Sequence, residues 1–239
     1  FTVPQVTNLV ITEPVGQTVP LSWIIPGICD LSKGTDPIYI PDNGSGEFGP
    51  LTSHPYNAEE DYVTANGSSP IYGQYGIGFN IPATKDLSWL SYEWKGSHEN
   101  ISLCATACDN NNAYWDASSY PTNLHNTDFT SKGPYTLKNT WWNDGMPANA
   151  PEVSQIVIFA NAGAAENNVS FSVRNVRYGI AGQEDIDHVI VVRKDRAIPA
   201  DHTDGTVYNV GTKSHFLDND GTKEFGHTYY YSVYAVHAH

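Results

Sequence analysis

The chain has 239 residues, 40% of them hydrophobic, which is enough for one large β domain or two modest ones with a buried core. Its formal net charge is −14, and a surface this acidic repels nucleic acid and anionic lipid, so we exclude both as partners. No apolar run reaches the roughly 18 residues that a spanning helix needs, so we expect no membrane insertion.

The N-terminus and the sequons favour an extracellular or cell-surface protein. The chain starts at Phe1 and shows no signal peptide, so we interpret it as a mature extracellular chain. Four Asn-x-Ser sequons agree with a surface glycoprotein: Asn43, Asn66, Asn100 and Asn168.

The cysteines are three in number, Cys29, Cys104 and Cys108, so they cannot form a closed disulfide framework. If Cys104 and Cys108 share one strand, they lie about 13 Å apart, which is too far for a bond between them. A turn between them, or a bond from Cys29 to one of them, would satisfy the geometry.

Two strands are predicted near the N-terminus, at residues 6–12 and 19–23. The second has Val19, Leu21 and Trp23 alternating toward the core. Over residues 28–68 the pattern breaks down into turn chemistry with few periodic apolar positions. A loop of that length is uncommon inside one domain, so we expect an inserted domain to begin here.

The middle of the chain predicts a β-sandwich of jelly-roll type, because six to eight strands are separated by turn signals. No helix longer than about two turns is expected. Gly76 and Gly78 indicate close packing over a neighbour. The expected strands are residues 71–81, 87–94, 101–107, 153–160 and 169–178, with shorter candidates at 114–115, 135–137 and 140–142.

Four further strands are predicted after Gly182, at residues 186–193, 206–210, 214–218 and 226–236. The last is the clearest strand of the chain. Its Tyr229, Tyr231, Val233 and Ala235 fall on one face.

Residues 1–26 and 184–239, taken together, resemble a fibronectin type III domain. Trp23 matches the core Trp of the family's second strand, and Tyr229-x-Tyr231-x-Val233 matches its sixth. The resemblance implies that Tyr229 forms a tyrosine corner, with its hydroxyl bonded to the turn backbone.

The insert is similar in outline to carbohydrate-binding modules, in the order of its segments at residues 77–81, 87–96, 101–103 and 114–116. The predicted fold is therefore all-β: a split fibronectin-III-like β-sandwich, residues 1–27 and 183–239, with an inserted jelly-roll β-sandwich, residues 28–182.

The resemblance also implies a seventh strand after the sixth, but this sequence stops at His239. One alternative is that the native chain continues. The other is that another chain supplies the strand, as in β-strand addition between copies. The segment Phe1–Gln5 is a candidate donor, although Pro4 cannot give a ladder hydrogen bond.

A sugar site needs flat aromatic rings with nearby amides and carboxylates. Trp141 and Trp142 are adjacent, so on a strand at most one of them faces the core; Trp89 and Trp94 also face opposite ways. The candidate carbohydrate-binding residues are Trp94, Trp115, Trp141, Trp142, Asn143 and Asp144.

For metal, Asp218-x-Asp220-Gly begins like a calcium loop, so Asp218, Asp220 and Glu224 are the candidate Ca²⁺ ligands. The twelfth-position Glu of an EF-hand is missing, and the same residues also fit a plain turn before the last strand. A second, weaker pair is His237 and His239, which could share Zn²⁺.

No recognisable catalytic motif accompanies the carboxylates of the insert, Glu93, Glu99, Asp109 and Asp116, so we expect no enzyme. The predicted function is extracellular, non-catalytic carbohydrate binding or adhesion. The alternative is a structural subunit of an extracellular filament or surface layer, assembled by β-strand donation.

Overall fold

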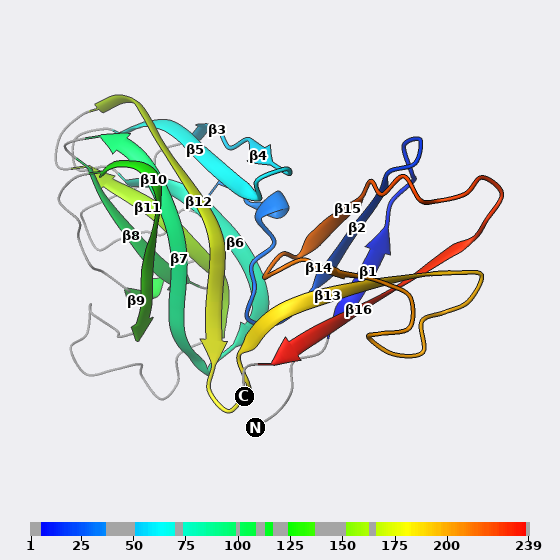
Figure 1. The fold of residues 1–239 in the computed structure, drawn as a ribbon. Coiled ribbons are helices and arrows are strands. Elements are labelled where there is room, and N and C mark those ends of the chain that lie inside the picture. Colours follow the sequence, from blue (N-terminus) through cyan, green and yellow to red (C-terminus); the bar gives the residue numbers. More distant parts are fainter. Residues whose placement is uncertain are drawn as a thin grey trace. The chain divides into compact units, whose positions relative to one another are not determined.

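A computed structural model of the chain describes residues 6–36, 51–69, 74–98, 101–108, 113–116, 124–136, 152–162 and 166–237. Within these ranges the fold is nearly all β, with sixteen strands and one short 3-10 helix, η1 (Leu31–Lys33) (Figure 1). This confirms the predicted all-β class. None of the helical structure in the described ranges is long and apolar enough to cross a membrane.

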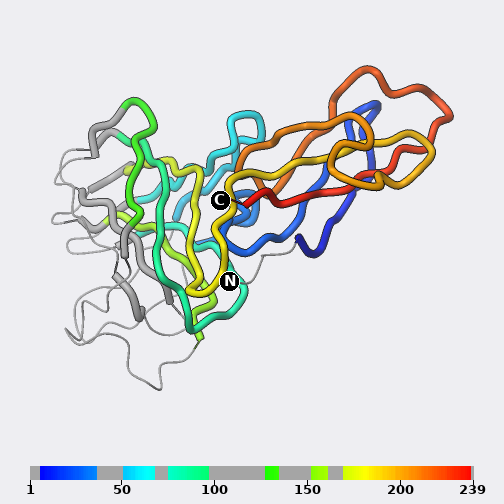
Figure 2. The backbone as a smooth tube through the Cα atoms, turned by 60° about the horizontal axis from the view of Figure 1, so that its bottom comes forward, coloured from blue at the N-terminus to red at the C-terminus, as the bar shows by residue number. Residues whose placement is uncertain are grey.

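The chain divides into two compact units. Unit 1 combines Phe1–Ile28 with Gly182–His239, and unit 2 is Cys29–Ala181. The boundaries expected from the sequence, after residue 27 and before residue 183, each differ from these by one residue. Figure 2 follows the backbone from the blue strands of unit 1 through unit 2 and back to the orange and red strands of unit 1.

Unit 1 contains two three-stranded antiparallel sheets, with the strand orders β1-β2-β15 and β14-β13-β16. The first sheet joins the two N-terminal strands to β15 from the last part of the chain, and the second consists of three strands from the last part. The strands are β1 (Thr7–Ile11), β2 (Val19–Ile24), β13 (Ile186–Asp195), β14 (Thr206–Asn209), β15 (His215–Asp218) and β16 (Tyr229–His237).

The core of unit 1 lies between these sheets. Val19, Leu21 and Trp23 of β2 are buried there, as their alternation predicts, and they form one cluster with Val189 and Val191 of β13. Three of the four residues predicted to share a face on β16 pack against this cluster: Tyr231, Val233 and Ala235.

Unit 2 also contains two sheets. One has the order β10-β7-β12-β5-β3, with β4 paired to β5, and the other has the order β6-β11-β8-β9. The first sheet uses β3 (Leu51–Ser53), β4 (Tyr56–Asn57), β5 (Tyr62–Ser69), β7 (Leu87–His98), β10 (Leu124–Thr136) and β12 (Glu166–Ile180). The second uses β6 (Gln74–Thr84), β8 (Ile101–Cys108), β9 (Ala113–Asp116) and β11 (Val153–Ala162).

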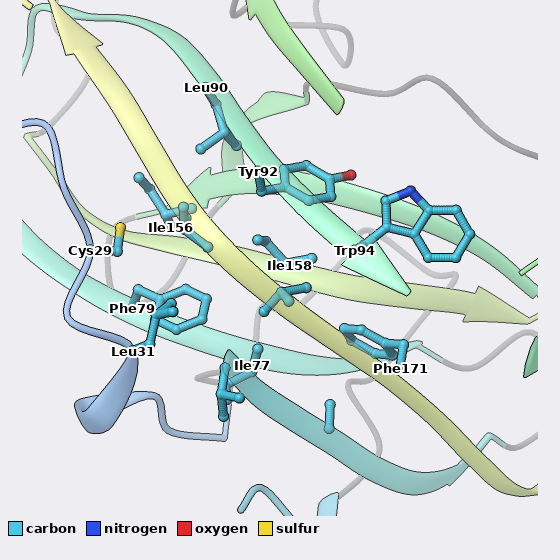
Figure 3. Close-up of a cluster of buried hydrophobic side chains, with 14 of the residues drawn as sticks. Cys29, Leu31, Ile77, Phe79, Leu90, Tyr92, Trp94, Ile156, Ile158 and Phe171 are labelled. Atoms are coloured by element: carbon cyan, nitrogen blue, oxygen red, sulfur yellow. The ribbon is translucent and has the colours of Figure 1, made fainter. Parts of the chain in front are cut away.

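The core of unit 2 is formed by side chains from both sheets, together with Leu31 of η1 and Cys29 (Figure 3). Tyr92 and Trp94 come from β7, and Ile156 and Ile158 from β11. Strand β11 is buried on both faces, since Val157, which points the other way, is also fully buried. The apolar run at residues 153–160 is thus a central strand.

Two long strands were not predicted. β5 lies in the stretch that the sequence suggested to be irregular, and only Val63 and Ala65 mark its inward face. β10 has thirteen residues and almost no apolar alternation, and only its last two residues fall in a predicted strand, the one at residues 135–137. The candidate strand at residues 140–142 lies outside the described residues. The two family resemblances remain predictions.

The described cysteine positions limit disulfide formation. Cys104 and Cys108 both lie on β8, four residues apart, so about 13 Å separates them and they cannot bond to each other. Cys29 is buried and free, and burial raises the pKa of its thiol.

Close packing at the glycines of β6 is confirmed. A Cβ added to Gly76 would collide with the Cβ of Phe159 and the carbonyl oxygen of Ile158 on β11. A Cβ added to Gly78 would lie 2.7 Å from Nε2 of Gln155. The glycines therefore allow β11 side chains to cross over the β6 backbone.

We expect Gly76→Ala to destabilise unit 2 by about 1–3 kcal/mol, because neither a backbone oxygen nor a Cβ can move aside cheaply. Urea unfolding would measure this. The control is Gly221→Ala, whose added Cβ meets only Gln17 Oε1 at 3.9 Å. Equal stability of the two variants would contradict the packing described for β6.

Candidate functional site: the open edge of unit 1

Within the described ranges, one side of unit 1 is closed and the opposite side is open. On the closed side, the rings of Tyr208 from β14 and Phe216 from β15 lie 4.9 Å apart. β14 and β15 are edge strands of the two sheets, so the other two edges, β1 and β16, lie together at the opposite side (Figure 1). Among the described residues, β16 pairs only with β13 and β1 only with β2.

The side chains at the open side are less covered than those in the middle of the sandwich. Val189 and Val191 of β13 are 0% exposed, whereas Val233 and Ala235 of β16, which face the same core, are only partly buried. On β1, the exposed fractions of Leu9, Val10 and Ile11 are 37%, 47% and 48%. Partly exposed apolar side chains are therefore present on both edge strands of the open side.

The backbone of β13 shows which groups of β16 point away from β13, and these have no partner among the described residues. The N–H of Val189 donates to the carbonyl oxygen of Gly211 at 2.7 Å, and its carbonyl accepts from the N–H of Val210 at 3.0 Å. Backbone groups alternate sides along a strand, so odd-numbered residues of β13 face β14 and even-numbered residues face β16. The bond from the N–H of Arg196 to the carbonyl of Thr228, at 2.8 Å, continues the same pattern.

It follows from the register, in which Ile190 is opposite Tyr234 and Val192 is opposite Ser232, that even-numbered residues of β16 bond to β13. The N–H and C=O groups of Tyr231, Val233 and Ala235 then point to the open edge. These are the same residues whose side chains face the core. An incoming strand would find unpaired backbone groups and an apolar surface in register with each other.

A buried ionic cluster fixes β16 in place. The carboxylate of Asp218, at the end of β15, is 0% exposed and accepts hydrogen bonds from Arg193 at 2.9 and 3.2 Å. It also accepts from Nζ of Lys223 at 2.9 Å and from the hydroxyl of Tyr231 at 2.7 Å. Asp218 thus joins β13, β15 and β16.

Arg193 has several hydrogen-bond and aromatic partners besides Asp218. Its guanidinium donates to Asp220 at 3.1 Å and to the hydroxyl of Thr222 at 2.7 Å. It also lies 5.7 Å from the ring centroid of Tyr208 and 5.3 Å from that of Tyr229. An Arg with only 4% exposure needs such a full set of partners to offset its desolvation.

The hydroxyl of Tyr229 accepts a hydrogen bond from the backbone N–H of Glu224 at 2.7 Å. The predicted bond between this hydroxyl and the turn backbone is confirmed. It ties the start of β16 to the loop before it.

The cluster shifts the pKa values of its members. Burial alone would raise the pKa of Asp218, but hydrogen bonds from Lys223, Tyr231 and Arg193 outweigh burial and hold that pKa below its usual value. Burial and the bond to Asp218 raise the pKa of the Tyr231 hydroxyl. Asp218 is therefore an anion and Tyr231 a donor at neutral pH.

The calcium ligands predicted from the sequence do not form a metal site in the described part of the chain. The carboxylates of Asp218 and Asp220 are bound by Arg193 and Lys223, so cationic side chains lie where a metal was expected. Glu224 is 72% exposed and lies 3.3 Å from His227. Across the described ranges, no group of three or more His, Cys, Asp or Glu side chains could hold a metal ion.

Only one member of the weaker zinc pair lies within the described residues. His237 lies 4.0 Å from Glu184. Its predicted partner, His239, lies outside the described residues.

Of the six predicted sugar-binding residues, only Trp94 has a described side chain. Trp94 is 1% exposed and belongs to the core of unit 2, so its assignment as a sugar-stacking ring was wrong. Trp115 lies on β9, and the positions of Trp141, Trp142, Asn143 and Asp144 lie outside the described residues. Of the four carboxylates weighed for catalysis, Glu93 forms an ion pair with Arg174 at 2.6 Å.

Sequence reasoning missed a second polar surface, the solvent-facing side of the sheet that contains β5, β7, β10 and β12. There Nζ of Lys95 lies 4.5 Å from the ring centroids of both Tyr62 and Phe129. Arg174 lies 4.1 Å from the Phe129 centroid. Trp89 lies on this face too, opposite in direction to Trp94 as predicted, and its ring covers the backbone of Gly179.

The Arg193–Asp218 pair was also missed, although one signal was present. Arg193 continues the inward alternation of Val189 and Val191, and a charge at an inward position requires a buried partner.

We expect Asp218→Asn to destabilise unit 1 by about 3–5 kcal/mol, because it leaves the buried Arg193 and Lys223 without their anion. The control, Asp187→Asn, alters a carboxylate that is 61% exposed and should change stability by less than about 0.5 kcal/mol. Urea unfolding at neutral pH measures both.

Acid provides a second test of the same carboxylate. A carboxyl group whose folded-state pKa is lowered stabilises the fold above its unfolded pKa of about 3.9, and this stabilisation is lost as pH falls below that value. The wild type should therefore lose more stability below about pH 4 than Asp218→Asn does. Parallel acid profiles would contradict the role given to Asp218.

Comparisons with protein-family models, with curated proteins and with solved structures found no match.

Proposed function

We propose that this chain is a structural subunit of an extracellular filament or surface layer, joined to its neighbours by β-strand addition at β16. The observation that carries the proposal is the edge of β16, a nine-residue strand with no partner on its outer side among the described residues. A long, uncharged, unprotected edge is a template for pairing with another chain, and soluble proteins normally cover or charge such edges.

The edge of β16 offers an incoming strand both backbone hydrogen-bonding groups and apolar side chains. Tyr231, Val233 and Ala235 each present one N–H and one C=O, and each intermolecular hydrogen bond is worth about 0.5–1.5 kcal/mol net. The partly buried side chains of the same residues gain further burial when a strand covers them. The hydrogen bonds and the apolar burial together give an incoming strand its affinity for β16 and fix the register in which it pairs.

The charge of the chain supports a specific contact over general aggregation. A net charge of −14 makes copies repel each other at most orientations. Residues 229–236 carry no charged side chain, so this strand adds no charge repulsion between copies. Assembly through one neutral edge is compatible with solubility elsewhere on the surface.

Val233→Pro tests the proposal. Its backbone nitrogen faces the open edge, so proline removes a donor that an incoming strand needs and keeps the bonds from β16 to β13. We expect the concentration for half-maximal assembly, measured by light scattering and sedimentation velocity, to rise at least tenfold.

The matched control is Val207→Pro on β14, the other edge strand of the same sheet. By the same alternation, its nitrogen also faces away from β13. This variant should assemble like the wild type, and thermal unfolding of both variants verifies that they fold. Unchanged assembly of folded Val233→Pro, or a wild type that stays monomeric at all concentrations, would refute strand addition at β16.

Glycan binding is a second candidate function, and Trp89 favours it. Its ring covers the backbone of Gly179, where a side chain would collide with it, and it is only partly buried on the solvent-facing side of the sheet. A partly exposed indole suits stacking against a sugar ring.

Trp89→Ala should weaken binding to a glycan about tenfold, equivalent to about 1.4 kcal/mol, in a glycan-array screen followed by titration. The control is Tyr230→Ala, which removes a 38% exposed ring from unit 1 and should leave binding unchanged. If the wild type binds no glycan on the array, this second function is discarded.

A further inference from the structure

We infer that the solvent-facing side of the sheet that contains β5, β7, β10 and β12 binds an acidic glycan, and that Lys95 and Arg174 hold its carboxylate or sulfate group. The inference rests on the second candidate function, glycan binding at Trp89, and adds to it the chemical class of the glycan. It follows from five side chains that we call the Lys95 cluster: Tyr62, Glu93, Lys95, Phe129 and Arg174.

Four neighbouring strands build the Lys95 cluster. β7 carries Glu93 and Lys95, and β12, the next strand in the sheet, carries Arg174. The two rings come from the strands on either side of this pair, Phe129 from β10 and Tyr62 from β5. Their centroids lie 5.6 Å apart, so the rings meet across β7 and β12.

Both cations of the cluster contact the same ring. Nζ of Lys95 lies 4.5 Å from the centroids of Tyr62 and Phe129, and Cζ of Arg174 lies 4.1 Å from that of Phe129. The two cations are therefore no farther apart than the sum of their distances to the Phe129 ring. Like charges at such a separation repel each other, and an anion bound by both of them relieves that repulsion.

The cluster has one positive charge in excess among the described residues. Nε of Arg174 donates to Glu93 at 2.6 Å, but in the same described ranges no carboxylate lies within ion-pair distance of Lys95. The three N–H groups of Lys95 and the four on the terminal nitrogens of Arg174 have no acceptor there. The Arg174 side chain is 39% exposed, so a ligand can approach it from solvent.

The composition of the chain makes such an excess unusual, because Lys and Arg together number 12 against 26 Asp and Glu. At about 0.15 M salt the Debye length is about 8 Å, so distant carboxylates are screened and the local charge determines which ligand is attracted. A densely charged polyanion still meets the negative field of the whole chain. The favoured ligand is therefore a mostly neutral glycan with occasional acid groups.

The position of Trp89 favours a sugar over an acidic peptide. Trp89 lies on the same outer face of β7 as Lys95, six residues away, which is about 20 Å along a strand. Arg177, opposite Ser91, lies on this face between them. An extended glycan can stack on the indole and place an acid group between Lys95 and Arg174 at the same time. A peptide carboxylate would use the cations alone.

Three polymers with one sugar backbone test the inference: dextran, sparsely substituted carboxymethyl-dextran and sparsely substituted dextran sulfate. Each is titrated against the full chain at about 0.15 M salt. We expect at least one acidic polymer to bind more tightly than dextran, and the two acidic polymers show whether a carboxylate or a sulfate is preferred. Lys95→Gln should weaken binding of the preferred polymer about tenfold, because a charge-assisted hydrogen bond is lost.

The matched control is Lys85→Gln, which changes the net charge equally at an exposed position between β6 and β7. It should bind like the wild type, and thermal unfolding verifies that both variants fold. Lys95→Arg keeps the charge and should retain the preference for the acidic polymer. If Lys85→Gln weakens binding as much as Lys95→Gln does, the preference is a general charge effect and the inference is wrong.

The remaining outcomes separate the inference from the function on which it rests. If dextran and its acidic forms bind equally and Trp89→Ala weakens all of them, glycan binding stands and the acidic class is wrong. If poly-L-glutamate binds as tightly as carboxymethyl-dextran, the site recognises a carboxylate without a sugar, which also overturns the inference. If neither these polymers nor any glycan on an array is bound, glycan binding and the inference fall together.

Discussion

The buried carboxylate of Asp218 is the interaction on which unit 1 depends. It accepts hydrogen bonds from Arg193 on β13 and Tyr231 on β16, and from Lys223 in the loop between β15 and β16. Removing any ion from water is costly, and only this full set of partners makes the burial of Asp218 and Arg193 tolerable. The cluster therefore forms only when three strands from both sheets are correctly placed, and it holds β16 in one register.

A fixed register matters because β16 is an edge. Its inner row of backbone groups bonds to β13, and its outer row, on the residues whose side chains face the core, has no partner among the described residues. If β16 frayed, its outward backbone groups and the partly buried side chains of Val233 and Ala235 would no longer be presented together to an incoming strand. The ionic cluster and the hydrogen bond between Tyr229 and Glu224 hold β16 in the conformation that presents both. We interpret the open side as a preorganised acceptor for a strand.

Prediction from sequence succeeded where side chains alternate between core and solvent. Trp23 on β2 and Phe171 on β12 lie on inward faces as their two-residue period requires, and the two segments of unit 1 could be recognised as parts of one unit. It failed for β10, whose polar residues take their strand conformation from pairing with β7. It also failed for Trp94, because alternation does not say which face of a strand will be covered by the second sheet. The ionic cluster depends on a contact between residues 25 apart, and no local pattern specifies such a pair.

Residue-resolved hydrogen exchange of the β16 amides, measured by NMR or mass spectrometry in dilute and assembled protein, tests the central claim most directly. In dilute protein, amides that bond to β13, those of Tyr230, Ser232 and Tyr234, should be protected, and those of Tyr231, Val233 and Ala235 should exchange freely. On assembly, the second group should become protected while the first changes little. Protection of both groups in dilute monomer, or continued free exchange of Val233 in the assembled state, would contradict the account of β16 as an acceptor edge.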